Sequence, residues 1–258
     1  MTNLETLEEL EELLDVFIDQ LRGAVGDVNA PLGRAALTTP TAPDELSLGA
    51  RTVVLRESYG LATAHRVNSL LLEVPRELPA YPRGGPSRSP VSADAALREP
   101  ELPLFVVYCD ERSAKMSTLP PGAPASLLFY DSARRLQGRM ALQRLALSEA
   151  ERLRRWDTLS LRQRRDYQSA EAPGHRVNSI EESHRQRESS TGDGRERERE
   201  DAEHFTALIF ELHLLEILQL NRAGHRRGIF RPLPWSAPET ARRTGSSPRS
   251  WEASWLVP

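Results

Sequence analysis

The chain has 258 residues, is 39% hydrophobic and carries a formal net charge of −3. This length suffices for one large domain or two small ones, and the charge gives no reason to expect nucleic acid as a partner. The single cysteine, Cys109, excludes an internal disulfide and any metal site built from several cysteines. Because the chain has no apolar run of membrane-spanning length and starts with an acidic segment, we expect a cytoplasmic protein that does not insert into membranes.

The N-terminal 25 residues predict an amphipathic helix. Large apolar residues recur at three- and four-residue steps from Leu4 to Leu21, which places them in one stripe that packs on the core of the protein. Residues 35–39 and 50–56 are short β-prone segments on either side of a Pro-rich, acidic connection. They predict a β-hairpin.

Three further strands are predicted in the middle of the chain. A short apolar segment at 69–74 is followed by a loop at about 75–103, whose seven prolines exclude a continuous element. Strands are then expected at 104–109, 125–130 and 136–146. Within the last of these, Gly138 marks a bulge or a bend.

The second half of the chain mixes helical, polar and ambiguous segments. Ser148 and Glu151 have the spacing of a capping box, and a helix is expected over 153–167 with an interruption near 157–160. Residues 170–203 are almost wholly polar with alternating charges, which favours a solvated, disordered insertion over an RNA-binding arm. Residues 205–220 suit either a buried helix or a strand, and the Trp-rich tail is expected to pack down. About seven strands with few helices favour a β-barrel or sandwich with peripheral helices.

The distribution of basic residues points to one position. Lys115 is the only lysine in a chain with thirty-three arginines, and it follows a predicted strand together with Arg112 and Ser113. A compact ammonium, a planar guanidinium and a hydroxyl are suitable ligands of a phosphate. Arg51 shares one face of its predicted strand with Val53, so Arg51 and Lys115 could meet at one phosphate if their strands are neighbours. The alternative is that these cations are ordinary surface residues.

Other kinds of site find little support. The six histidines show no spacing with a carboxylate that is typical of a metal site, and no phosphate-loop or nucleophile-elbow motif occurs. We therefore expect no metal, and the sequence identifies no catalytic residue.

Five blocks of the sequence together resemble the pyridoxamine 5′-phosphate oxidase-like family of FMN-binding proteins. The segment 51–56 is similar to the Arg-x-Val-Leu-Leu-Lys strand of that family, and 109–115 to its Thr-Asp-x-Arg-Ser-x-Lys segment. The pair 130–131 with 136–137, the segment 225–227 and the closing 255–258 match the remaining blocks in order and approximate spacing.

The resemblance implies a mainly β fold, a six-stranded split barrel that forms a homodimer with FMN in the cleft between subunits. The chain would then consist of an N-terminal helix at 1–25 and a single FMN-binding domain at 26–258, with polar insertions at about 75–103 and 170–203. The implied function is that of an oxidoreductase acting on a small molecule. A barrel that serves as a non-catalytic binding or sensor module is the alternative, and a haem-binding barrel with His225 as axial ligand is a third.

Site residues follow from the matched positions. Arg51 and Lys115 would hold the FMN phosphate, while Gln137 and Arg227 would approach the flavin ring. His225 would contact substrate. The full set implied for the cofactor is Arg51, Thr52, Val53, Val54, Leu55, Arg56, Cys109, Arg112, Ser113, Lys115, Gln137 and Arg227.

Some positions depart from the family pattern. Cys109 replaces a threonine, Arg56 replaces a lysine, and Gly138 stands where a larger residue is usual. Ala223 precedes His225 where an oxidase has the arginine that orients substrate. FMN binding is therefore better supported than oxidation of pyridoxamine phosphate.

Overall fold

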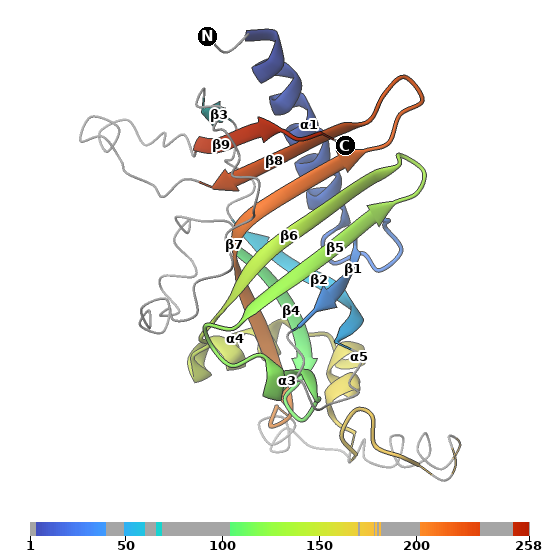
Figure 1. The fold of residues 1–258 in the computed structure, drawn as a ribbon. Helices are drawn as coiled ribbons and strands as arrows, with labels where there is room; N and C mark the ends of the chain where they lie inside the picture. Colours follow the sequence, from blue (N-terminus) through green and yellow to red (C-terminus); the bar gives the residue numbers. More distant parts are fainter. Residues whose placement is uncertain are drawn as a thin grey trace, which may run out of the picture.

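The computed structural model describes residues 4–39, 49–59, 66–68, 104–169, 171–177, 179, 181, 202–232 and 250–257. Its helices are α1 (Leu4–Ala24), α3 (Lys115–Thr118), α4 (Glu149–Thr158), α5 (Leu161–Arg164) and the 3-10 helix η2 (Arg165–Tyr167). Its strands are β1 (Arg34–Thr38), β2 (Ala50–Tyr59), β3 (Arg66–Asn68), β4 (Leu104–Asp110), β5 (Pro124–Asp131), β6 (Leu136–Leu145), β7 (Phe205–Gln219), β8 (Arg226–Pro232) and β9 (Ser250–Trp255). Figure 1 shows α3, α4 and α5 toward one end of the molecule and α1, β8 and β9 toward the other.

Six antiparallel strands close into a barrel in the order β7–β4–β2–β1–β5–β6, and β6 pairs back onto β7. The predicted hairpin is present, since β1 and β2 pair with Ala35 opposite Val53. Residues of β5 are exposed and buried by turns, the pattern of a strand with one face on the core and one on the solvent. The mainly β, six-stranded barrel fold predicted from the sequence is confirmed.

Strand β7 settles the ambiguity at 205–220 in favour of a strand. It pairs with β4 at its start, with Phe205 opposite Asp110, and with β8 at its end, with Gln219 opposite Arg226. Its first eight residues are all buried. The barrel core covers one face, while the other packs against the α4–η2 segment at Phe205 and against β4 and the end of β6 at Ala207 and Ile209. Burial on both faces removes the alternation by which a strand is distinguished from a buried helix. Beyond the barrel, β8, β9 and β3 continue the sheet.

From Leu10 to Leu21, the predicted apolar stripe of helix α1 packs in one core with residues of the barrel strands and the sheet extension. Figure 1 shows the course of the helix. Phe17 and Leu21 are fully buried there. A Cβ atom at Gly138 would lie 2.2 Å from Cζ of Phe17, so the glycine makes room for the aromatic ring. The bulge predicted at Gly138 is wrong, because the register of β6 shifts between Ala141 and Leu142 instead.

The helical stretch predicted at 153–167 is interrupted where expected, between the end of α4 and the start of α5. A complete capping box opens α5, with Ser160 and Gln163 exchanging hydrogen bonds. At α4, Ser148 Oγ accepts a hydrogen bond from the Glu151 backbone N at 3.2 Å, but the Glu151 side chain pairs with arginines of its own helix. The capping box predicted at Ser148 is therefore only half formed.

Some sequence predictions fall outside the described residues, namely the apolar segment 69–74, the Pro-rich loop at 75–103 and most of 170–203. Near the end of the last range, Ala202 is fully buried and its carbonyl accepts a hydrogen bond from Arg152 Nη1. Ala202 is thus packed on the core, and the predicted solvated insertion at about 170–203 stays a prediction. The C-terminal tail packs as expected, with Trp251 of β9 in the main hydrophobic core. The division into a helix at 1–25 and a domain at 26–258 stays a prediction.

Candidate functional site

Strands β2 and β4 are neighbours in the barrel and run antiparallel, with Leu55 opposite Val107. The start of β2 and the end of β4 therefore lie at the same end of the barrel. Arg51 is the second residue of β2, and Lys115 opens α3 shortly after β4. Burial lowers the pKa of the Lys115 ammonium, and the charge of Arg51 adds to this effect. The structure thus brings together the two cations that the sequence assigned to one phosphate.

The Lys115 ammonium is oriented by the loop that precedes it. Its Nζ donates a hydrogen bond to Ser113 Oγ at 2.8 Å, and Ser113 Oγ donates to the Asp110 backbone oxygen at 2.7 Å. An ammonium has three N–H donors, and among the described residues no carboxylate forms an ion pair with this one. Lys115 therefore retains donors for an external anion.

Arg112 is held within its own loop. Its Nε and Nη2 donate to the two carboxylate oxygens of Asp110 at 3.1 and 2.7 Å, and Nη2 also donates to the Ser169 backbone oxygen at 2.9 Å. Burial alone would raise the pKa of the Asp110 carboxyl, but the hydrogen bonds from Arg112 hold it below its ordinary value. The Arg112 fork thus orders the loop that carries Ser113 and Lys115.

Cys109 is buried next to this loop. Its thiol lies 3.6 Å from Met116 Sδ. Burial raises the pKa of the Cys109 thiol to about 11, although the charges of Lys115 and Arg144 act in the opposite direction. The thiol is therefore protonated at neutral pH and has no nucleophilic role there.

The segment 51–56 divides its side chains between two faces of β2. Val53 and Leu55 are buried in the barrel core, so their side chains are not available to a ligand. Thr52 is exposed and Val54 is half-buried on the opposite face, which is the outer surface of the barrel. The register of β2 with β4 shifts after Leu55. The positive charge of the half-buried Arg56 acts on the Tyr167 hydroxyl of η2 and opposes the rise in its pKa that burial causes.

Gln137 and Arg227 lie in one row across the outer face of the sheet, with Leu218 between them. Arg227 Nη2 forms an ion pair with Glu216 at 3.2 Å, and the other oxygen of the same carboxylate pairs with Arg139 at 3.4 Å. The two residues predicted to approach the flavin ring therefore lie on one surface of the sheet, with one strand between them.

His225 lies in the turn between β7 and β8, exposed to solvent. Its Nδ1 accepts a hydrogen bond from the Asn221 backbone N at 3.2 Å, which ties the ring to the turn. In the described part of the chain, no group of three or more His, Cys, Asp or Glu side chains is arranged to hold a metal ion. No described helix is long and apolar enough to cross a membrane.

Sequence reasoning missed Arg144, a buried cation on β6. It follows Met140 and Leu142 at two-residue steps, and the burial pattern of the strand shows that all three belong to the core-facing set. An arginine at a position where alternation requires an apolar residue is a signal present in the sequence, but it becomes visible only once the strand ends are known.

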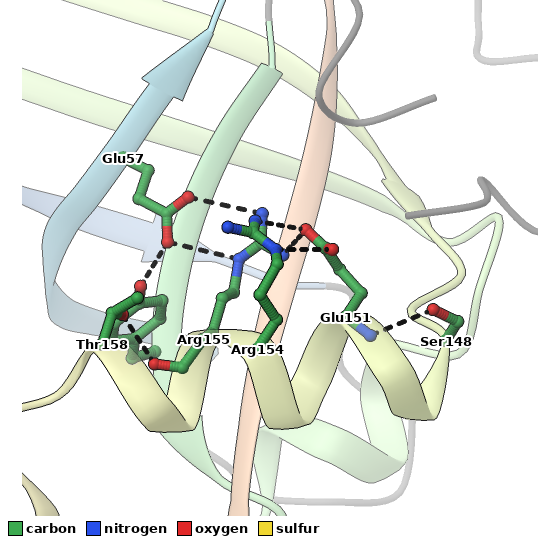
Figure 2. A network of polar contacts seen from close by, with 7 residues as sticks. Glu57, Ser148, Glu151, Arg154, Arg155 and Thr158 are labelled. Atoms are coloured by element: carbon green, nitrogen blue, oxygen red, sulfur yellow. Dashed lines mark hydrogen bonds and ion pairs between the residues drawn. The ribbon is translucent and has the colours of Figure 1, made fainter. Parts of the chain in front are cut away.

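A polar network that the sequence did not predict holds α4 against the outer face of the barrel (Figure 2). Arg155 lies between Glu57 of β2, with Nε 3.2 Å from Oε1, and Glu151 of its own helix. Tyr108 of β4 donates a hydrogen bond to the same Glu57 carboxylate. The network joins two barrel strands to α4, and α5 and η2 follow α4 directly in the chain.

Among the solved structures that match, two cover nearly the whole chain with TM-scores above 0.5. One is a pyridoxamine 5′-phosphate oxidase-related, FMN-binding protein from Nostoc punctiforme, with a TM-score of 0.53 and 16% identity over 94% of this chain and 96% of that one. The other is PhzG from Burkholderia lata in complex with tetrahydrophenazine-1-carboxylic acid, with a TM-score of 0.57 and 16% identity over 96% of this chain and 91% of that one. No protein-family model and no curated protein matched the sequence. The chain thus has the split-barrel fold of pyridoxamine 5′-phosphate oxidase-related, FMN-binding proteins, the likeness predicted from its sequence.

Proposed function

We propose that the protein is an FMN-binding flavoprotein that acts as an oxidoreductase on a small molecule. The observation that carries this proposal is the pairing of Arg51 and Lys115 at one end of the barrel, with Ser113 orienting the lysine at 2.8 Å. Two cations this close repel each other, and a phosphate between them would turn that repulsion into charge-assisted hydrogen bonding. The donor set therefore suits the phosphate of FMN.

The rest of the cofactor would extend along the outer face of the barrel. Thr52 and Val54 lie on that face of β2, beyond Arg51. Gln137 and Arg227 lie near the starts of β6 and β8, at the other end of the barrel, so they would approach the ring of a flavin held by the partner subunit. Bound FMN supplies the electron-transfer chemistry, while the protein binds it, orients the ring and sets the charge around it. The ligand of the PhzG structure, a small cyclic acid, supports a small-molecule substrate by fold analogy alone.

A second copy of the chain would complete the site. On the outer face of β5, Leu128 and Tyr130 are 42% and 50% exposed, and Tyr130 lies opposite Gln137. Cofactor sites bury most of their ligand, which one convex barrel surface cannot do. An isologous homodimer formed through this face would cover these apolar side chains and enclose two equivalent sites.

A flavin-binding barrel without catalytic activity is the second candidate. The ion pairs of Glu216 with Arg227 and Arg139 favour it, because the carboxylate offsets the positive charge that would otherwise act on the ring. Reduction of the bound flavin by candidate small molecules, followed anaerobically, separates the two. A flavin that no candidate reduces supports the binding module.

The proposal is tested by the visible spectrum of the purified protein and by the flavin released when the protein is denatured. We expect the absorption bands of oxidised flavin and release of FMN. A colourless protein that does not take up added FMN would refute the flavoprotein proposal, and a haem Soret band would favour the third alternative.

A further inference from the structure

Arg144 is a buried, charged side chain in the wall of the barrel. It is 9% exposed and lies near the end of β6, two residues beyond the fully buried Leu142. Its backbone pairs with the turn before β5, since its N–H donates to the Ala123 oxygen and its carbonyl accepts from the Gly122 N–H. The start of β5 and the end of β6 lie at the barrel end where β4 also ends, so Arg144 belongs to the same end of the barrel as Arg51.

The guanidinium of Arg144 lacks compensation within the described residues. Its Nε is buried without a hydrogen-bond partner there, and it takes part in no ion pair among those residues. The carboxylate of Glu111 acts on it electrostatically, but Glu111 is exposed. A buried, unpaired cation is costly, and proteins normally pair it or bind an anion to it.

Cys109 connects Arg144 to the other cations at this end. The charges of Lys115 and Arg144 both act on the Cys109 thiol, and the charge of Arg51 acts on Lys115. The thiol is protonated at neutral pH and cannot neutralise them. Three cations from β2, the β4–β5 loop and β6 therefore converge on one region.

We propose that Arg144 is the third cation of the anion site formed with Arg51 and Lys115, and that this site takes a dianionic phosphate monoester. The inference rests on the proposed function, for which the phosphate monoester is that of FMN. A monoester carries nearly two negative charges at neutral pH, which three cations match better than two. A guanidinium also adds planar N–H donors that the ammonium lacks.

A purely structural role for Arg144 and a role in anion binding predict different effects of its replacement on the stability of the ligand-free protein. If the guanidinium stabilises the barrel, its replacement by methionine would lower the stability of the ligand-free protein. If it serves an anion, methionine of similar length should leave the stability of the ligand-free protein unchanged or raise it, because an uncompensated buried charge is removed. Stability without ligand and affinity for ligand therefore respond differently in the two cases.

The experiment compares Arg144→Met with the wild-type protein and with Arg162→Met, which removes the same charge from an exposed position on α5. Dissociation constants for FMN and riboflavin are measured by flavin fluorescence, and thermal unfolding is followed with and without inorganic phosphate. For Arg144→Met we expect an FMN dissociation constant about 10- to 100-fold higher, the effect of one charge-assisted hydrogen bond, with unchanged riboflavin binding. Phosphate should stabilise the wild type and Arg162→Met more than Arg144→Met.

Several results would overturn the inference. These are unchanged FMN affinity, equal losses for FMN and riboflavin, or an Arg144→Met protein that fails to fold without ligand. Arg144→Lys serves as a second variant, which should recover part of the FMN affinity because it restores the charge. If the wild type binds no flavin but is stabilised by phosphate through Arg144, the flavoprotein proposal fails while the anion site stands. If FMN binds wild type and variant equally, the flavoprotein proposal stands and the role of Arg144 fails.

Discussion

Lys115 is the residue on which the phosphate assignment depends most. Its ammonium is half-buried, held by one hydrogen bond to Ser113 and close to the charge of Arg51. Lys115→Ala should weaken FMN binding by about 1.5–3 kcal/mol, the usual contribution of a charge-assisted hydrogen bond. The measurement is titration of FMN fluorescence, with Ser117→Ala, an exposed position of the same helix, as control. An FMN affinity equal to that of the control would exclude Lys115 from the phosphate site.

The Phe17 ring packs against Gly138, and this contact affects stability. A Cβ at Gly138 would lie 2.2 Å from the Phe17 ring, so Gly138→Ala should destabilise the protein by about 1–3 kcal/mol through overpacking. Gly23→Ala is the matched control, because nothing lies within 4 Å of a Cβ there and alanine favours its helix. Chemical denaturation measures both.

The double variant Gly138→Ala with Phe17→Leu tests the cause of that effect. If the clash is responsible, the two substitutions should be non-additive, because leucine leaves room for the new methyl group. Strictly additive losses would show that the strain lies elsewhere.

Only some residues of the candidate site could be predicted from the sequence. Lys115 and Ser113 stood out because their types and spacing match a phosphate-binding block, and they are neighbours in the structure. The commitment of Arg112 to Asp110 was not foreseeable, because the same guanidinium can bind a phosphate or a nearby carboxylate and only the loop conformation decides. Arg144 was missed because its burial depends on where β6 ends.

Among the elements, α4 is attached to the barrel by ionic contacts as well as apolar packing (Figure 2). Arg155 and Arg154 both bind Glu151, whose side chain is 2% exposed, but only Arg155 also reaches Glu57 of β2. Arg155→Met should cost about 3–5 kcal/mol, since it leaves buried carboxylate without its main partner. Arg154 is 38% exposed, so Arg154→Met should cost about 0–1 kcal/mol.

Equilibrium unfolding in urea distinguishes the two variants. Similar small losses for Arg155→Met and Arg154→Met would mean that the network contributes little and that α4 is held by the packing of Trp156 on Phe205.

Most barrel strands were predictable as short β-prone segments bounded by turn residues. This holds for β5 and for the hairpin of β1 and β2, and also for β4, although β4 is buried on both faces. Strand β7 remained ambiguous because its 15 residues are long enough for a buried helix and its first half is buried on both faces. That burial is a tertiary property with no local signal.

For the whole molecule, the surface proposed for the dimer is not the one that the apolar segments of the sequence suggest. Apolar segments such as 205–220 and the Trp-containing tail would be natural interface material, but β7 and Trp251 are buried in the core of the protomer itself. Leu128 and Tyr130, by contrast, are exposed and lie two positions apart on the outer face of β5. Sequence hydrophobicity cannot distinguish burial within a subunit from burial between subunits.

A homodimer formed through the outer face of β5 should be weakened when a charged residue is introduced there. Tyr130→Glu should shift the protein toward monomer and weaken FMN binding, because a carboxylate would be buried unpaired at the interface. Leu161→Glu, at an exposed apolar position of α5, should do neither. Sedimentation at micromolar concentration with and without FMN measures both variants, and FMN should stabilise the dimer. A wild-type monomer that binds FMN tightly would rule out a site between subunits.

The flavin site as a whole is tested most directly by titrating FMN-free protein with FMN and, separately, with riboflavin, and following the fluorescence of each. We expect saturation at one FMN per chain and riboflavin binding that is about 100-fold weaker or more, because riboflavin lacks the phosphate that Arg51 and Lys115 would hold. Absence of FMN binding, or equal affinity for the two flavins, would contradict the proposed site.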